Sequence, residues 1–104
     1  MRIIVEPRVH EAIDEFYDAA IFQHRHTLSY ETVENKKQRL YAGIQSLDSY
    51  YRIFGTARLK QDWIKNGWQE FICEDFHFAF EHGYDPDGVE TIIVRDAVHS
   101  LLFR

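Results

Sequence analysis

Four side chains in the second half of the chain have the types that acid–base chemistry on a phosphodiester requires. Asp75 and His77 belong to one strand-like segment, and Arg95 and His99 belong to the next. Alternate residues of a strand point to the same face of a sheet, so each pair should share a face. Histidine titrates near neutral pH, and arginine can stabilise the charge of a phosphorane. An acid, two histidines and an arginine together suit cleavage of a phosphodiester.

The residues that alternate with these four are apolar. They form an aromatic face of Phe76, Phe78 and Phe80 and an aliphatic face of Ile92, Val94 and Val98. If both apolar faces pack against helices, all four polar side chains point to the open face of the sheet. Ordinary solvent exposure of a polar sheet face would also explain these residues.

The first half of the chain predicts a strand and two helices. Residues 2–5 form a short apolar run, and Pro7 suits the first position of a helix, where its missing N–H is not needed. Ser29 is a good N-cap for a second, long helix. Both helical segments carry an apolar stripe at the spacing of one buried helix face. The short linker between them favours an antiparallel helical hairpin.

In the second half of the chain the hydrophobic period changes to that of strands. Asn66 and Gly67 lie between two tryptophan-containing apolar segments and are a strong signal for a β-hairpin turn. A second turn over residues 83–88 separates the aromatic strand from a final strand over residues 91–99.

This order of elements predicts an α+β fold in a single domain of residues 1–104. A strand is followed by a two-helix hairpin and then by an antiparallel meander of three or four strands. The first strand reaches the meander by one crossover. The helices should cover one face of the sheet and leave the other face open for function.

Composition narrows the function classes. The net charge of −5 disfavours nucleic-acid binding, which needs many lysines and arginines. Cys73 is the only cysteine, which excludes an internal disulfide and a zinc site built on paired cysteines. No apolar run is long enough to span a membrane, and we expect a cytoplasmic protein.

Two stretches of the second half carry motifs of a known family. The first contains Leu59-Lys60-Gln61-Asp62-Trp63, Gly67-Trp68-Gln69-Glu70 and Glu74-Asp75-Phe76, and the second is Val98-His99-Ser100-Leu101-Leu102-Phe103. Their shared features are a Leu-Lys pair, a glycine-aromatic step into a strand, an acidic pair before an aromatic strand, and a C-terminal histidine followed by Leu and Phe. With the predicted topology, they resemble the RelE/ParE superfamily of bacterial toxins, and most closely the YafQ-like branch of RelE-type mRNA interferases.

The resemblance implies a toxin that enters the ribosomal A site and cleaves mRNA, with no metal and no cofactor. The ribose 2′-hydroxyl would attack the adjacent phosphate with the help of side-chain acids and bases. His99 and Asp75 would be catalytic, with His77 as a third candidate. The side chains assigned to substrate binding are Lys60, Arg95, Arg58 and Phe103. The apolar tail that follows His99 is expected to anchor it.

The sequence also departs from the family. Ile72 stands where the YafQ-like branch has a further histidine. Many RelE-type enzymes have an arginine in the next strand, and the nearest polar residue to that position in this sequence is His77. These toxins are usually basic, whereas residues 70–96 contain eight acids and one base. The resemblance implies a cognate antitoxin as a protein partner, and this acidic region predicts that the partner carries basic residues.

Three functions follow as hypotheses. The first is a ribosome-dependent endoribonuclease toxin of a toxin–antitoxin pair, which the histidine-containing tail favours. The second is a non-catalytic protein of the same fold, either ParE-like or degenerate, that acts by binding a protein, which the acidic charge favours. The third is an unrelated small α+β binding module. The codon preference, the antitoxin and the oligomeric state do not follow from the sequence.

Overall fold

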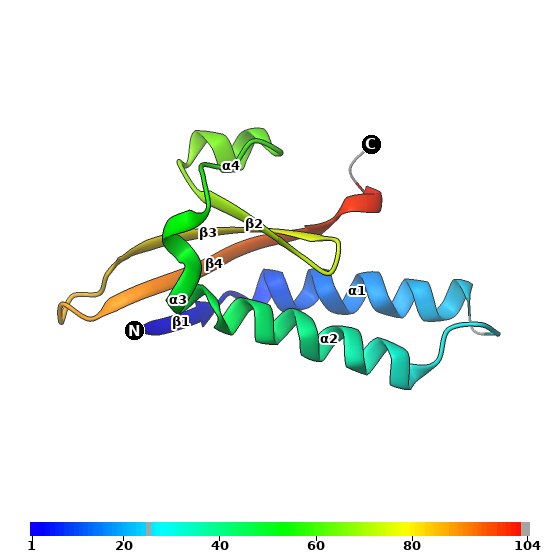
Figure 1. Ribbon diagram of the computed structural model, residues 1–104. Coiled ribbons are helices and arrows are strands. Elements are labelled where there is room, and N and C mark those ends of the chain that lie inside the picture. The colour runs from blue at the N-terminus through cyan, green and yellow to red at the C-terminus, as the bar shows by residue number, and fades with distance from the viewer. Residues whose placement is uncertain (25, 103–104) are drawn as a thin grey trace.

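Two long helices and a four-stranded sheet form the framework of the molecule (Figure 1). The computed structural model describes residues 1–24 and 26–102. The elements are β1 (Arg2–Val5), α1 (Pro7–Gln23), α2 (Tyr30–Gln45), α3 (Leu47–Tyr50), the 3-10 turn η1 (Tyr51–Ile53), α4 (Gln61–Lys65), β2 (Gln69–Cys73), β3 (Phe76–Tyr84), β4 (Glu90–His99) and the 3-10 turn η2 (Ser100–Leu102). No helix in these two ranges is long and apolar enough to cross a membrane.

The predicted helical hairpin is confirmed. Pro7 occupies the first turn of α1, and the Ser29 hydroxyl accepts a hydrogen bond from the Thr32 backbone N–H at the start of α2. Figure 1 shows the two helices running side by side. Their buried stripes, Val9, Ile13 and Tyr17 in α1 and Val33, Leu40 and Ile44 in α2, join the three phenylalanines of β3 in one core.

The sheet has the strand order β1-β4-β3-β2. Strands β2, β3 and β4 form an antiparallel meander, and β1 pairs with β4 in parallel. The α+β class and the crossover from β1 are therefore confirmed, and the sheet is mixed rather than antiparallel throughout. The parallel pairing follows from the long connection through α1 and α2, because only a crossover can return the chain in the same direction.

The hairpin predicted at Asn66 and Gly67 is wrong. These residues end helix α4, where Gly67 has a φ of +69°, as is common just after a helix. A glycine with positive φ serves a helix end as well as a hairpin, so the dipeptide does not distinguish them. The burial of Trp63 of α4 against Ala79 selects the helix. Part of the sheet face that was expected to be open is therefore covered.

A β-bulge at Arg95 reverses the predicted faces of the end of β4. Val94 pairs with Phe80 and Asp96 pairs with Ala79, so Arg95 is an extra residue on its strand. Beyond the bulge, Ala97 and His99 lie on the same sheet face as Val94, toward the helices. Asp96 and Val98 lie on the opposite face with Trp63. The predicted alternation assumed an uninterrupted strand, and one inserted residue is enough to invert it.

Candidate functional site

The three candidate catalytic residues lie at one end of the sheet. His99 pairs with Phe76 and His77 pairs with Val98 across β3 and β4, and Asp75 immediately precedes β3. Because of the bulge, His99 faces the helices and His77 faces the other side of the sheet. The predicted convergence of these side chains on one face is therefore wrong, although the sheet end is shared.

His99 is buried between aromatic rings. Its imidazole stacks on Phe16 of α1 at a centroid distance of 3.7 Å and an interplanar angle of 11°, and meets Phe76 edge to face. The residue is 8% exposed. The Leu101 backbone N–H donates to Nδ1 over 3.1 Å. Burial lowers the pKa of His99 from its usual value near 6.5, because a buried charge is disfavoured.

Asp75 belongs to the tight turn between β2 and β3. Glu74 and Asp75 have φ values of +50° and +67°, in the left-handed region that Asp tolerates better than Glu. The Asp75 side chain is exposed, and it forms no ion pair with a residue that the structure describes. Its negative charge partly offsets the lowering of the pKa of His99.

His77 is paired with a carboxylate of its own sheet. Its Nδ1 lies 3.1 Å from Oε2 of Glu70, and both side chains are mostly buried. The other oxygen of Glu70 accepts a hydrogen bond from the Arg58 backbone N–H at 3.4 Å. The pair thus connects β2, β3 and the segment before α4. Arg58 contributes its backbone here, and its exposed side chain forms no ion pair in the described part of the chain.

Lys60 is engaged by Asp96, a residue that the sequence did not single out. The Lys60 ammonium lies 3.5 Å from Oδ2 of Asp96, and the Trp63 indole N–H donates to the same oxygen over 2.8 Å. Asp96 is only 5% exposed. The three residues fix α4 onto the sheet. Asp96 could be found from sequence only by knowing the bulge, because an unbroken strand places it on the core face.

Arg95 lies between two carboxylates. Its guanidinium donates to Glu6 and, over 2.9 Å, to Oε1 of Glu81. The Trp68 indole N–H donates to the other oxygen of Glu81 over 2.7 Å. The hydrogen bond from Arg95 is the main reason that the pKa of Glu81 is lowered. Nε of Arg95 is buried without a partner among the described residues.

The predicted substrate-binding residues therefore differ in their availability. Lys60 and Arg95 neutralise carboxylates of the same chain, whereas the Arg58 side chain is exposed. Phe103 lies outside the described residues. Carboxylates of the same chain thus already offset the charges of Lys60 and Arg95.

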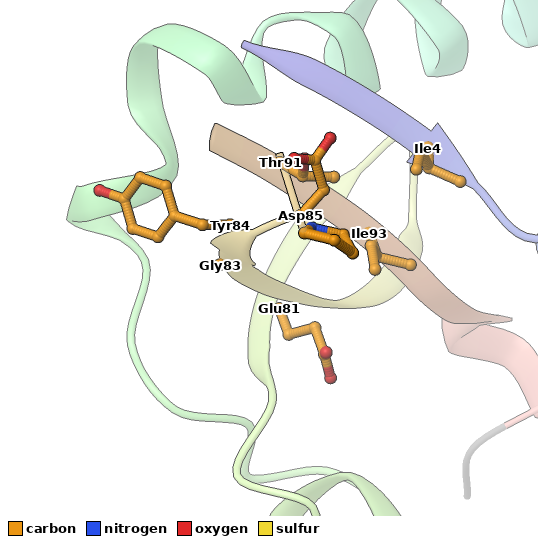
Figure 2. A pocket seen from close by; sticks show the side chains of 8 residues that line it. Ile4, Glu81, Gly83, Tyr84, Asp85, Thr91 and Ile93 are labelled. Atoms are coloured by element: carbon orange, nitrogen blue, oxygen red, sulfur yellow. The ribbon is translucent and has the colours of Figure 1, made fainter. Parts of the chain in front are cut away.

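A shallow groove of about 270 Å³ lies on the sheet face away from the helices, beside the β3–β4 turn (Figure 2). Its lining includes the apolar side chains of Ile4 and Ile93. Its two carboxylates are already used within the chain, since Glu81 binds Arg95 and one oxygen of Asp85 accepts two backbone N–H groups of its own turn. The groove offers apolar contact and no evident acid–base group.

A second histidine cluster lies at the other end of the sheet. His82 stacks on Tyr51 of η1 at a centroid distance of 4.4 Å, and its Nε2 lies 2.8 Å from Oε1 of Glu90. The Tyr51 hydroxyl donates to the same oxygen over 2.8 Å and accepts from Nε of Arg52. His82 thus belongs to a partly buried network. Nothing in the local sequence links Tyr51 to Glu90.

In the described ranges, no group of three or more His, Cys, Asp or Glu side chains is placed to hold a metal ion. A scan against protein-family models and a search of curated proteins find no match to this chain.

Proposed function

We propose that this chain is a RelE/ParE-like protein of a toxin–antitoxin pair that acts by binding another protein rather than by cutting RNA. The family part of the proposal is supported by the motifs of the second half and by an α+β fold with a helical hairpin on one sheet face. The binding mode is supported by one observation. The candidate cations Lys60 and Arg95 are held by carboxylates of the same chain.

The energetic argument starts from Asp96. A phosphate that draws Lys60 away from Asp96 leaves a carboxylate that is 5% exposed without its cation. Losing one partner of a buried ion pair costs about 3–5 kcal/mol, and the part-exposed Lys60 reduces this value. Drawing Arg95 to a phosphate would carry a similar cost at two carboxylates, because both Glu6 and Glu81 would lose a hydrogen-bond donor. A surface built in this way is poorly suited to RNA and leaves the acidic excess available to a basic protein partner.

A ribosome-dependent endoribonuclease is the second candidate. The observation that favours it is the position of Asp75, exposed at the sheet end and close enough to His99 to influence its pKa. The Leu101 N–H occupies Nδ1, so His99 would act as a neutral donor through Nε2 and not as the base. Asp75 would then be the base.

Inducible expression in bacteria, with sequencing of mRNA 5′ ends, separates the two candidates. The proposal predicts growth arrest that a co-expressed neighbouring gene product relieves, without new cuts at codons in translated mRNA. Arrest should persist in Asp75→Asn. Codon-specific cuts that Asp75→Asn abolishes would support the endoribonuclease. Absence of both arrest and a co-purifying neighbouring product would reject both candidates and favour an unrelated binding module.

A further inference from the structure

The C-terminal turn η2 is held to the molecule by polar contacts rather than by its leucines. Leu101 and Leu102 are 58% and 68% exposed. The Ser100 N–H and hydroxyl donate to the Asp75 carbonyl over 2.8 Å and 2.7 Å. The Leu101 N–H donates to Nδ1 of His99. The expected order is thus reversed, because His99 anchors the turn instead of being anchored by it.

The bond from Leu101 fixes the protonation state of the ring. A backbone N–H can only donate, so Nδ1 of His99 must present its lone pair. The ring is therefore neutral, with its proton on Nε2. An imidazolium carries a proton on each nitrogen, and its Nδ1–H would face the Leu101 N–H, donor against donor. The contact exists only while the ring is neutral.

The surroundings of His99 keep the ring neutral at neutral pH. Phe16 of α1 and Phe76 of β3 enclose it and supply no hydrogen-bonding group. Lys36 of α2 and His77 of β3 act on the pKa of His99 in the same direction as burial. Asp75, from the turn before β3, opposes them but does not outweigh burial.

The remaining ionisable groups at this end are already accounted for. Arg39 of α2 and Glu74 form an ion pair of 3.0 Å, so their charges largely cancel. Tyr17 of α1 has a raised pKa, chiefly because it is buried, and remains neutral through the range in which histidine titrates. His99 is therefore the histidine in direct contact with the turn, and its protonation is the charge change that the turn would experience.

We propose that His99 is an acid-sensitive latch for the C-terminal turn. Its neutral ring holds the Leu101 amide, and protonation of the ring releases η2 together with its two exposed leucines. The release is confined to Leu101 and Leu102, because Ser100 keeps its hydrogen bonds to the Asp75 carbonyl and β4 keeps its pairing with β3. The latch is independent of the proposed function, since it requires neither RNA nor a partner.

Two matched variants separate the effect of the hydrogen bond to Leu101 from the effect of losing the imidazole ring. In His99→Asn the amide oxygen takes the place of Nδ1, so the variant keeps an acceptor for Leu101 but cannot titrate. In His99→Gln no acceptor lies at that position. Both variants lose the stacking on Phe16, so differences between them report the acceptor. His82 provides an internal control, because it lies at the opposite end of the sheet.

The test is an NMR titration of the 15N-labelled full chain from pH 8 downward, through the midpoint of the His99 ring. Long-range proton–nitrogen spectra should show the Nε2–H tautomer of His99 at high pH. The heteronuclear NOE of the Leu101 amide should fall with the midpoint of the His99 ring, and not with that of His82. His99→Asn should keep this NOE throughout the range, and His99→Gln should lack it throughout. An Nδ1–H tautomer, a Leu101 amide that stays rigid through the His99 midpoint, or equal behaviour of the two variants would overturn the latch.

Discussion

The two ends of the sheet each place a histidine against an aromatic ring on the helix-facing side, with opposite electrostatic consequences. At one end His99 stacks on Phe16 and accepts a backbone N–H. At the other end His82 stacks on Tyr51 and meets the carboxylate of Glu90. A donor beside an imidazole requires the neutral ring, whereas a carboxylate favours the charged ring. The group that contacts a ring nitrogen, rather than the ring on which the histidine stacks, therefore decides whether the neutral or the charged form is favoured.

The largest expected effect is at the His99 end. Phe16→Ala removes the ring on which His99 stacks and opens a space beside Phe76. We expect the free energy of unfolding to fall by about 3 kcal/mol, the lower limit for phenylalanine truncation, because Phe16 is partly exposed. Urea denaturation followed by tryptophan fluorescence measures the change. A loss below ~1 kcal/mol would show that the stack contributes little to the fold.

A smaller loss is expected at the His82 end from Tyr51→Phe. The ring that stacks on His82 remains, and only the hydroxyl that connects Arg52 and Glu90 is removed. Unfolding in urea should therefore show a loss of stability well below that of Phe16→Ala. An equal or larger loss would mean that the hydrogen-bond network, rather than ring packing, fixes η1 to the sheet.

The pH dependence of stability should show a separate range for each end. The folded pKa of His99 lies below its unfolded value near 6.5, so protonation favours the unfolded chain and stability falls as pH drops below about 6.5. The pKa of Glu90 is lowered by hydrogen bonds from Tyr51 and His82, so its contribution is present above about 4.5 and is lost as pH falls further.

Thermal unfolding of two variants assigns these ranges. His99→Asn should flatten the dependence of Tm on pH between 7 and 5. It should leave the fall of Tm below about pH 4.5 unchanged. Glu90→Gln should reduce the fall of Tm below about pH 4.5 and leave the slope between pH 7 and 5 unchanged. If His99→Asn retains the full slope between pH 7 and 5, the lowered pKa of His99 does not control stability there.

The elements of the fold could be predicted where a local signal had one meaning. Pro7, the Ser29 cap and the alternating phenylalanines each indicated the element that is observed. The hairpin predicted at Asn66 and Gly67 was wrong because a glycine with positive φ fits both a hairpin and a helix end. The tertiary burial of Trp63, which decides between them, has no local signal.

The site was less predictable than the fold because it depends on relative faces. Because of one bulge at Arg95, His99 faces the helices and Asp96 contacts Lys60 on the opposite face of the sheet. Strand alternation carries no information about where a bulge occurs. The shared sheet end of Asp75, His77 and His99 could be predicted, since it requires only the order of the strands.

We propose that the sheet does not cleave RNA, because carboxylates of the same chain hold Lys60 and Arg95 and because His99 is buried. The most direct test of this proposal is incubation of the purified chain with programmed ribosomes that hold mRNA with an empty A site, followed by primer extension. We predict that the mRNA remains intact at every codon tested, for the wild type and for Asp75→Asn alike. Codon-specific cleavage by the wild type that Asp75→Asn reduces by about 10²-fold or more, the effect of losing one acid–base group, would contradict the claim.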